Sequence, residues 1–285
     1  MTRQSSQLEG KVCIVTGATS GIGLATAQAL AQQRAQVIVV GRNPEKSATA
    51  VARIQHESGN PSVEFALADL SVQAQIRQLA EEFESRLSRL DVLINNVGDF
   101  FFRRQLSADG IEMTLALNYL GVYLLTNLLL DKLKASAPAR VVNVSSDAHR
   151  RARIHFDDLE LEHKYNGLKA YGQSKLAMVL FTYELARRLE GTGVTANALH
   201  PGFTATNIVT SNEGPLKLLA GLIKLVALPP EEGAQTSVYL ASSPEVNGVT
   251  GKYFDKKRAV RSAPASYDEE AGERLWEISA QMTGL

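Results

Sequence analysis

Two patterns of hydrophobic and polar positions alternate along the chain. Short, nearly continuous apolar runs are separated by longer stretches in which apolar residues recur every three or four positions. Short apolar runs are typical of strands buried on both faces, and the longer pattern is typical of amphipathic helices. The alternation therefore predicts an α/β fold, a doubly wound and mostly parallel sheet with helices on both faces.

Seven apolar runs predict strands, at residues 11–15, 37–40, 63–68, 90–94, 140–144, 194–199 and 251–254. Helices are expected after Asn43-Pro44 and at residues 24–33, 72–87, 107–133, 170–189, 231–241 and 268–283. Asn43, Ser71 and Ser107 are the expected caps of the helices that follow them, because their side-chain oxygens can accept a bond from a free helical N–H. No repeat or linker interrupts the pattern, so a single domain over residues 1–285 is expected.

Composition narrows the possible functions. Lys and Arg together number 30, as do Asp and Glu, and this balance argues against a nucleic-acid partner. Cys13 is the one cysteine, which excludes an intrachain disulfide and a cysteine-based metal site. No stretch approaches the ~20 apolar residues of a membrane helix, and the polar first ten residues do not resemble a signal peptide. A cytoplasmic protein without an integral membrane segment is expected.

A glycine-rich turn joins the first predicted strand to the first predicted helix. Gly17 allows a tight turn, Gly21 lets backbone N–H groups approach an anion, and Gly23 lets helix and strand pack closely. The helix N-terminus adds free N–H groups and a partial positive charge. The arrangement predicts a cradle for a dinucleotide pyrophosphate, and an ordinary glycine-rich turn is the alternative.

The end of the second strand indicates which dinucleotide is bound. An NAD site places an acidic residue there to bind the ribose 2′-hydroxyl, whereas this chain has Gly41 followed by Arg42. A guanidinium can hold a 2′-phosphate through two parallel charge-assisted hydrogen bonds. We therefore predict a preference for NADP(H) over NAD(H), with a solvated surface arginine as the alternative.

Tyr171 and Lys175 lie four residues apart in a predicted helix and therefore on one of its faces. A free tyrosine has a pKa near ~10 and is a poor acid–base group at neutral pH. A nearby ammonium favours tyrosinate, so we expect Lys175 to lower the pKa of Tyr171. The pair predicts an acid–base site.

Taken together, four features resemble the short-chain dehydrogenase/reductase family, and in particular its retinol dehydrogenase-like branch. They are the G-x-x-x-G-x-G spacing of the glycine turn, the turn Asn95-Asn96-Val97-Gly98, the strand-end pair Ser145-Ser146 and the Tyr171/Lys175 pair. The resemblance covers essentially the whole chain and implies a Rossmann fold. It also implies an oxidoreductase that interconverts an apolar aldehyde or ketone and its alcohol by hydride transfer, with tyrosine as the acid or base.

The resemblance further implies the roles of individual residues. The catalytic set would be Asn118, which holds a water in a proton relay, with Ser146, Tyr171 and Lys175. The cofactor would contact Gly17, Thr19, Ser20, Gly21, Ile22, Gly23, Arg42, Asp69, Leu70, Asn95, Val97, Gly98, Tyr171, Lys175, Pro201, Gly202, Thr204 and Thr206. From the residues alone, Asp69 is equally well a turn aspartate and Asn118 a structural asparagine.

The segments around this set predict a substrate site. Some of Phe100–Phe102 are expected at an apolar pocket mouth, and residues 214–228, within a segment at about 203–230, are expected to form a substrate lid. A membrane-surface helix or a protein interface is the alternative for that segment. The polar insertion at residues 147–169 has no ligand spacing typical of a metal site, and His149, His155 and His163 are expected on its surface.

Other functions remain open at this level. A protochlorophyllide-type reductase shares the fold and the Tyr/Lys pair but has a cysteine after the tyrosine region, which this chain lacks. A sugar-nucleotide epimerase usually has a different glycine spacing and a larger C-terminal domain. A non-catalytic NADP(H)-sensing protein is the alternative from another class. The apolar helices at residues 107–133 and 170–189 are compatible with a homodimer.

Overall fold

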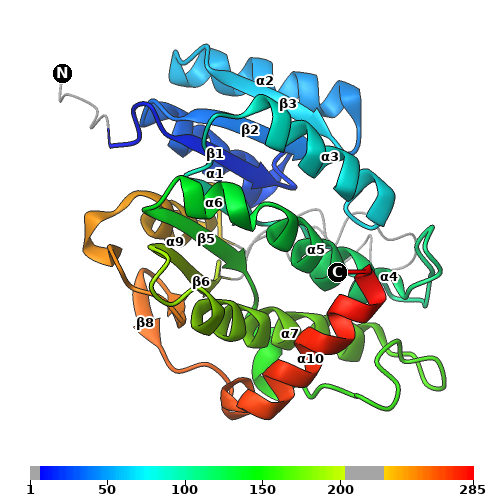
Figure 1. Cartoon of the computed structure of the whole chain (residues 1–285). Coiled ribbons are helices and arrows are strands. Elements are labelled where there is room, and N and C mark those ends of the chain that lie inside the picture. Colours follow the sequence, from blue (N-terminus) through cyan, green and yellow to red (C-terminus); the bar gives the residue numbers. More distant parts are fainter. Residues whose placement is uncertain (1–6, 203–227) are drawn as a thin grey trace.

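The computed structural model describes residues 7–202 and 228–285, and its elements are shown in Figure 1. Almost all of the expected lid lies outside these residues, as do Thr204 and Thr206. All seven predicted strands are present within the described part of the chain. The doubly wound α/β fold predicted from the hydrophobic pattern is therefore confirmed.

Eight strands form one sheet within the described residues, in the order β3-β2-β1-β4-β5-β6-β7-β8. Seven of them run parallel, and β8 pairs antiparallel with β7. They are β1 (Val12–Thr16), β2 (Gln36–Gly41), β3 (Val63–Leu67), β4 (Val92–Asn95), β5 (Ala139–Val144), β6 (Val194–His200), β7 (Lys252–Asp255) and β8 (Arg258–Val260). The order reverses between β1 and β4, so the loops after these strands diverge and leave a crevice at the carboxyl edge of the sheet.

Helices cover both faces of the sheet. On one face α1 (Gly21–Gln32), α2 (Pro44–Ser58) and α9 (Pro230–Ser242) enclose a core of aliphatic side chains. On the other, α3 (Gln73–Arg86), α5 (Gly121–Leu128), α7 (Gly167–Arg188) and α10 (Glu269–Thr283) enclose a larger one. Figure 1 shows α10 crossing α7, where Trp276 stacks on Phe181. Both faces of the parallel strands are therefore buried.

The long helix predicted at residues 107–133 is wrong in its start and its continuity. The chain instead forms α4 (Met113–Leu115), a π-helical turn η1 (Ala116–Leu120), α5 and α6 (Leu130–Ala135). Ser107 caps a turn, whereas the buried Glu112 carboxylate accepts bonds from the N–H groups of Thr114 and Leu115, at 2.9 and 2.8 Å. Sequence periodicity does not reveal this, because the segments from α4 to α5 form one continuous, mostly apolar run.

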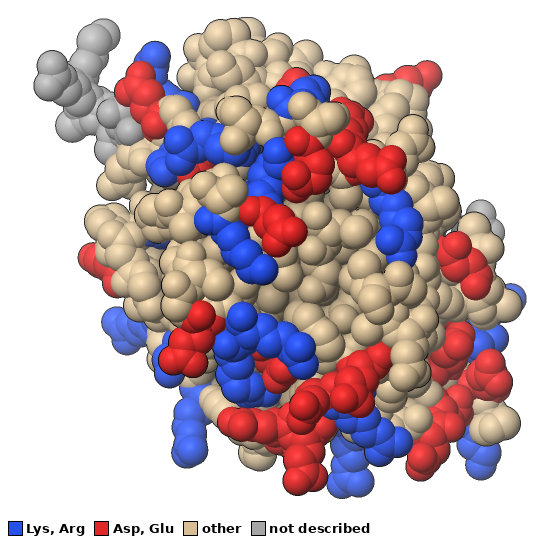
Figure 2. All heavy atoms as spheres, viewed as in Figure 1, with Lys and Arg blue, Asp and Glu red and all other residues tan. Residues whose placement is uncertain are grey.

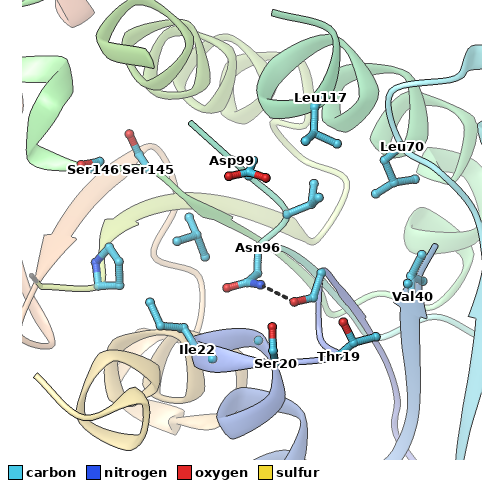
Figure 3. Close-up of a pocket in the computed structure, with 18 of the residues that line it drawn as sticks. Thr19, Ser20, Ile22, Val40, Leu70, Asn96, Asp99, Leu117, Ser145 and Ser146 are labelled. Atoms are coloured by element: carbon cyan, nitrogen blue, oxygen red, sulfur yellow. Dashed lines mark hydrogen bonds between the residues drawn. The ribbon is translucent and has the colours of Figure 1, made fainter. Parts of the chain in front are cut away.

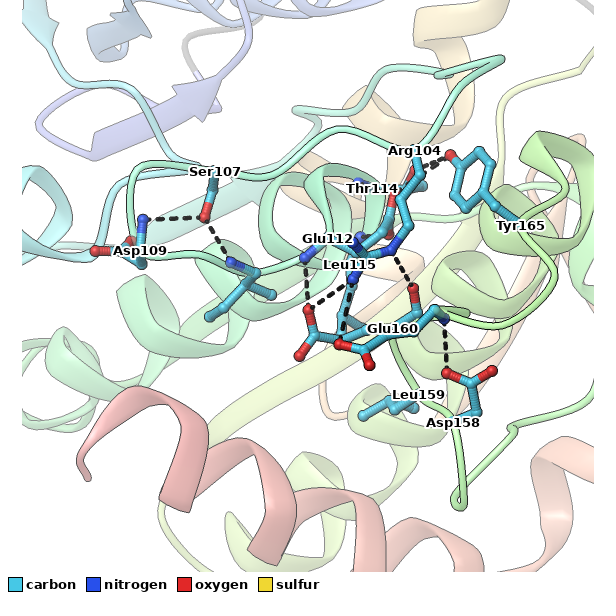
Figure 4. A network of polar contacts seen from close by, with 12 residues as sticks. Arg104, Ser107, Asp109, Glu112, Thr114, Leu115, Asp158, Leu159, Glu160 and Tyr165 are labelled. Carbon is cyan, nitrogen blue, oxygen red and sulfur yellow. Dashed lines mark hydrogen bonds and ion pairs between the residues drawn. The ribbon is translucent and has the colours of Figure 1, made fainter.

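A polar network around Glu112 holds the polar insertion against this helix start (Figure 4). The Glu160 carboxylate accepts from the Glu112 N–H at 2.9 Å, and Arg104 donates to the Glu160 carbonyl at 3.3 Å. Tyr165 donates to the Phe101 carbonyl at 2.9 Å. The insertion therefore fixes the loop after β4 that leads to the site.

Other boundaries also differ from the prediction. Asn43 caps α2 as predicted, but Ser71 does not cap α3, whose first N–H, at Gln73, donates to the carboxylate of Asp109. α7 begins at Gly167, three residues early, because Asn166 caps it. β8 was not predicted, because its three residues are all exposed and carry no hydrophobic pattern. The remaining short helices are η2 (Asp147–Arg151), η4 (Pro244–Val246) and η5 (Pro264–Tyr267).

Charges of both signs are interspersed on the face seen in Figure 2, in keeping with the balanced composition. Across residues 7–202 and 228–285, we find no helix with the length and apolarity needed to span a membrane.

Candidate active site

A cavity of about 450 Å³ opens at the carboxyl edge of the sheet, where the strand order reverses. This volume lies within the usual range of small-molecule sites. Figure 3 shows Thr19, Ser20 and Ile22 on one side, Leu70 and Leu117 on another, and Ser145 and Ser146 at the far end. Turns after β1, β2, β3, β4, β5 and β6 all contribute to the wall. This is where α/β sheets of this topology bind ligands.

The glycine turn has the shape of a phosphate cradle. A Cβ on Gly17 would lie 2.9 Å from the Val97 Cα, and a Cβ on Gly23 would collide with the Gly17 carbonyl and lie 2.9 Å from the Ala18 Cα. Gly17 and Gly21 also have positive φ angles, of 64° and 56°. The first turn of α1 carries no acidic side chain and faces the cavity. The turn therefore fits the pyrophosphate of a dinucleotide.

Two asparagines stand at the end of β4, and the one in the cavity wall is Asn96, which was not predicted as a cofactor contact. Asn96 donates to the carbonyls of Thr16 and Gly17, at 2.9 and 3.2 Å, and so braces the glycine turn. Asn95 is fully buried and donates to Thr126 and Asn143 instead. Asn95, which was predicted as a cofactor contact, therefore does not line the cavity. Successive side chains of a strand point to opposite faces, so only one of the two can face the cavity.

Arg42 lies at the rim of the cavity, where the sequence predicted it. Its side chain is 67% exposed, and its guanidinium lies 3.8 Å from the carboxylate of Asp69. The Asp69 carboxylate also accepts from the Ser71 N–H and hydroxyl, at 2.9 and 2.7 Å. The long ion pair leaves the guanidinium accessible at the cavity rim.

The two serines after β5 have different partners. Ser145 is buried and donates to the Lys175 carbonyl at 2.8 Å, which ties β5 to α7. Ser146 is half-buried, and its hydroxyl accepts from the Ala148 N–H at 3.2 Å. Both serines line the cavity with Tyr171, but only the Ser146 hydroxyl acts on the Tyr171 phenol, whose ionised form it favours.

Tyr171 and Lys175 both line the cavity, with the Lys175 Nζ 5.6 Å from the Tyr171 ring centroid. Burial raises the pKa of Tyr171, and the Ser146 hydroxyl opposes that rise. Burial lowers the pKa of Lys175 to about 8. The expected depression of the Tyr171 pKa by Lys175 is absent from this structure, because desolvation of the phenol dominates and the Lys175 ammonium donates to the Val144 carbonyl at 3.0 Å.

Asn118 lies in the π-helical turn, behind the cavity wall. Its Oδ1 accepts from the Asp99 N–H and its Nδ2 donates to the Asp99 carbonyl, both at 2.9 Å. A bond to Ser174 at 3.2 Å connects it to α7. Its side chain therefore fixes the loop after β4, which is the structural alternative left open by the sequence.

Phe100, alone among the three consecutive phenylalanines, contacts the predicted catalytic tyrosine. Its ring centroid lies 5.7 Å from that of Tyr171 and 4.7 Å from that of Phe102. Phe100 is buried and Phe102 is 47% exposed. Phe100 and Phe102 therefore form an apolar border beside Tyr171, whereas Phe101 packs against the core.

One of the three histidines expected on the surface is buried. His149 is fully inaccessible, whereas His155 is half-buried and His163 is exposed. The prediction for His149 is wrong because the turn after Ser146 folds under β7, which a sequence of mixed polarity does not reveal. Across the residues that the structure describes, no group of three or more His, Cys, Asp or Glu side chains is placed to hold a metal ion.

Most predicted cofactor residues meet at the one cavity, apart from Asn95 and the two threonines outside the described residues. Sequence reasoning missed a further group of wall residues, which are Val40, Gly41, Ala68, Asn96, Asp99, Leu117, Val144, Ser145 and His200. Apart from Leu117, which lies in the π-helical turn, these residues lie at or just after strand ends, and that position was the available signal.

This fold and site define a class of protein. The model of the short chain dehydrogenase family matches residues 11–215, and the chain belongs to that family, in its retinol dehydrogenase-like branch. It is therefore an oxidoreductase by family, with a fold that binds a nicotinamide dinucleotide.

Particular relatives cover nearly the whole chain. Human retinol dehydrogenase 13 is 45% identical over 98% of this chain and 86% of its own length. Human polyprenol dehydrogenase is 42% identical over 96% of this chain and 86% of its own.

Solved structures agree with this assignment. A protein of uncharacterised function from Mycobacterium paratuberculosis superposes with a TM-score of 0.79 at 32% identity, covering 97% of this chain and 94% of its own. Gluconate 5-dehydrogenase from Burkholderia cenocepacia, in complex with NADP and tartrate, superposes with a TM-score of 0.69 at 25% identity. The match covers 88% of this chain and 95% of the dehydrogenase chain.

Proposed function

We propose that the chain is an NADP(H)-dependent oxidoreductase that interconverts an apolar aldehyde or ketone and its alcohol. One observation carries the proposal: a single cavity contacts the glycine turn, Arg42 and the group formed by Ser146, Tyr171 and Lys175. An apolar substrate is supported by the phenylalanine border beside Tyr171 and by relatives whose names specify retinol and polyprenol, two apolar alcohols.

The cofactor would be held by the glycine turn at its pyrophosphate and by Arg42 at its 2′-phosphate. When bound, its nicotinamide supplies the hydride. Ser146 and Tyr171 donate hydrogen bonds to the substrate carbonyl oxygen, and these bonds strengthen as negative charge develops there. Tyr171 then gives its proton to that oxygen. Because burial raises the Tyr171 pKa, the phenol stays protonated at neutral pH, which favours reduction there.

The test is Tyr171→Phe, which keeps the ring and removes the proton donor. We expect this variant to bind NADPH with unchanged affinity, measured by fluorescence titration. We also expect it to reduce benzaldehyde, decanal and all-trans-retinaldehyde about 10²- to 10⁴-fold more slowly, the usual contribution of acid–base catalysis. Tyr239→Phe, at a half-buried tyrosine of α9 that donates to Glu245 and lies outside the cavity, is the matched control and keeps full activity.

Two outcomes count against the proposal. Near-normal turnover by Tyr171→Phe removes the acid–base role of this tyrosine. A wild-type protein that binds NADPH but oxidises none of it with the three aldehydes indicates a non-catalytic NADP(H)-sensing protein.

A further inference from the structure

His149 lies three residues after Ser146, in the 3-10 helix η2 that follows β5. Its side chain is completely buried and fits between the turn that carries Ser146 and the segment after β8. Nothing in the proposed reaction uses this ring. A buried imidazole needs a partner for each nitrogen, so its contacts identify what it holds.

The two ring nitrogens have partners of opposite kinds. Nδ1 lies 2.6 Å from the Ser146 carbonyl oxygen, and Nε2 lies 3.0 Å from the Ala263 N–H. A carbonyl oxygen can only accept and an amide N–H can only donate. Nδ1 must therefore carry the proton and Nε2 the lone pair, which defines one neutral tautomer.

The surroundings favour this neutral ring. Tyr253 of β7 packs against it with ring centroids 4.7 Å apart. The charged and titratable groups that face it are Asp147 and Arg150 on η2 and His200 on β6. Burial is the largest influence and lowers the pKa of His149 below its usual range.

We propose that His149 is a positioning residue for Ser146. The ring holds the Ser146 backbone at the end of β5 by accepting a bond from the Ala263 N–H and donating one to the Ser146 carbonyl. The Ser146 hydroxyl accepts from the Ala148 N–H on the same turn, which leaves its proton for Tyr171 or a substrate oxygen. A displaced backbone would misdirect that proton. The inference rests on the proposed function, in which Ser146 contacts the substrate.

Two substitutions distinguish the bond to the Ser146 carbonyl from the bond to the Ala263 N–H. In His149→Asn the amide nitrogen occupies the place of Nδ1 and keeps the bond to Ser146. In His149→Gln the amide oxygen takes the place of Nε2 and keeps only the bond to Ala263. We expect kcat for benzaldehyde, decanal or retinaldehyde to fall about tenfold in His149→Gln, as for one lost hydrogen bond, and less than about threefold in His149→Asn.

The KM for the aldehyde and the affinity for NADPH stay unchanged in both variants, because the bond matters where charge develops on the substrate oxygen. His163→Asn is the matched control, since it replaces an exposed histidine of the same insertion, and it keeps wild-type kinetics. A merely structural role predicts another result, in which both His149 variants lose kcat in proportion to their loss of Tm. That result, or a larger loss in His149→Asn than in His149→Gln, overturns the proposal.

An independent measurement does not depend on turnover. In protein labelled with [15N]histidine, the ring signals absent from His149→Asn belong to His149. We expect a protonated Nδ1 and an unprotonated Nε2 at pH 7, and the opposite tautomer or a charged ring overturns the proposal. Absence of turnover in the wild type also overturns it, and the NMR result then distinguishes a failed function from a wrong hydrogen-bond assignment.

Discussion

At the scale of single residues, burial shifts the pKa values of the two predicted acid–base residues in opposite directions. Burial penalises the charged form of any group, so it raises the pKa of the Tyr171 phenol and lowers the pKa of the Lys175 ammonium to about 8. The sequence-based argument considered only the attraction between the two groups. In the folded protein, desolvation outweighs it.

The pH dependence of the proposed reaction follows from these shifts. Aldehyde reduction with NADPH should stay level from pH 6 to about pH 9, because the raised pKa keeps the Tyr171 phenol protonated over that range. Alcohol oxidation should rise with pH instead, because it needs tyrosinate. Initial rates measured from pH 6 to 10 at constant ionic strength check this, and a reduction rate that falls steeply between pH 7 and pH 9 would contradict it.

Arg42 provides a residue-scale test of cofactor preference. Arg42→Asp removes the guanidinium and adds an acid that repels a 2′-phosphate. We expect about 10- to 100-fold weaker NADPH binding, the cost of lost charge-assisted bonds, with NADH binding unchanged or tighter. Arg53→Asp, at an exposed ion pair with Glu57 on α2, should change neither affinity. An equal loss for both dinucleotides would show that Arg42 does not recognise the phosphate.

At the scale of elements, the site depends on how the loop after β4 is held. Asn118 pairs with both backbone groups of Asp99 from the π-helical turn, and Tyr165 binds the Phe101 carbonyl from the insertion. Phe100 lies between these two anchors and packs against Tyr171. The loop is thus fixed from a helix on one side and from the insertion on the other.

Glu112 allows a test of this element. Glu112→Ala removes the acceptor for two N–H groups at the start of α4, and we expect the free energy of unfolding to fall by about 2 kcal/mol. Ser107→Ala is the comparison, because its hydroxyl accepts two longer bonds, at 3.2 and 3.4 Å. Ser107→Ala should lower the free energy of unfolding by less than about 1 kcal/mol. Urea unfolding followed by circular dichroism measures both, and a larger cost for Ser107→Ala would restore it as the cap.

At the scale of the whole molecule, one buried carboxylate joins segments far apart in the sequence at the amino edge of the sheet. Asp91 is 3% exposed and accepts from the Lys11 side chain at 2.8 Å and from the Val12 N–H at 2.9 Å. Arg89 adds two bonds, at 2.7 and 2.6 Å. Burial alone would raise the Asp91 pKa, but these donors outweigh it and the pKa is lowered.

Asp91→Asn should therefore reduce the free energy of unfolding at pH 7 by about 2 kcal/mol, through lost charge-assisted bonds. A lowered pKa stabilises the fold above the ordinary aspartate value of 3.8 and loses that effect as the pH falls below it. The difference between variant and wild type should shrink as the pH falls below 3.8. Asp131 forms an ion pair with Lys134 and its side chain is 95% exposed. Asp131→Asn should therefore leave the free energy of unfolding almost unchanged at any pH. Urea unfolding at pH 7 and pH 3 distinguishes the two.

The sequence predicted the features that depend on local order along the chain. Seven strands, the glycine turn and the Tyr171/Lys175 spacing could all be predicted, because a buried parallel strand is a continuous apolar run and i, i+4 side chains share a helix face. Family membership followed from the same motifs and is confirmed by the family model over residues 11–215. The strand ends also indicated where the cavity would lie.

Only the tertiary structure decided which of several polar residues takes each role. It placed Asn96 rather than Asn95 in the cavity wall, Glu112 rather than Ser107 at the start of α4, and His149 in the interior. Asn96 and His149 bind Thr16 and Ala263, which lie 80 and 114 residues away from them along the chain. Sequence pattern records the polarity of each residue, whereas hydrogen-bond partners and the cost of burial are set by contacts between distant segments.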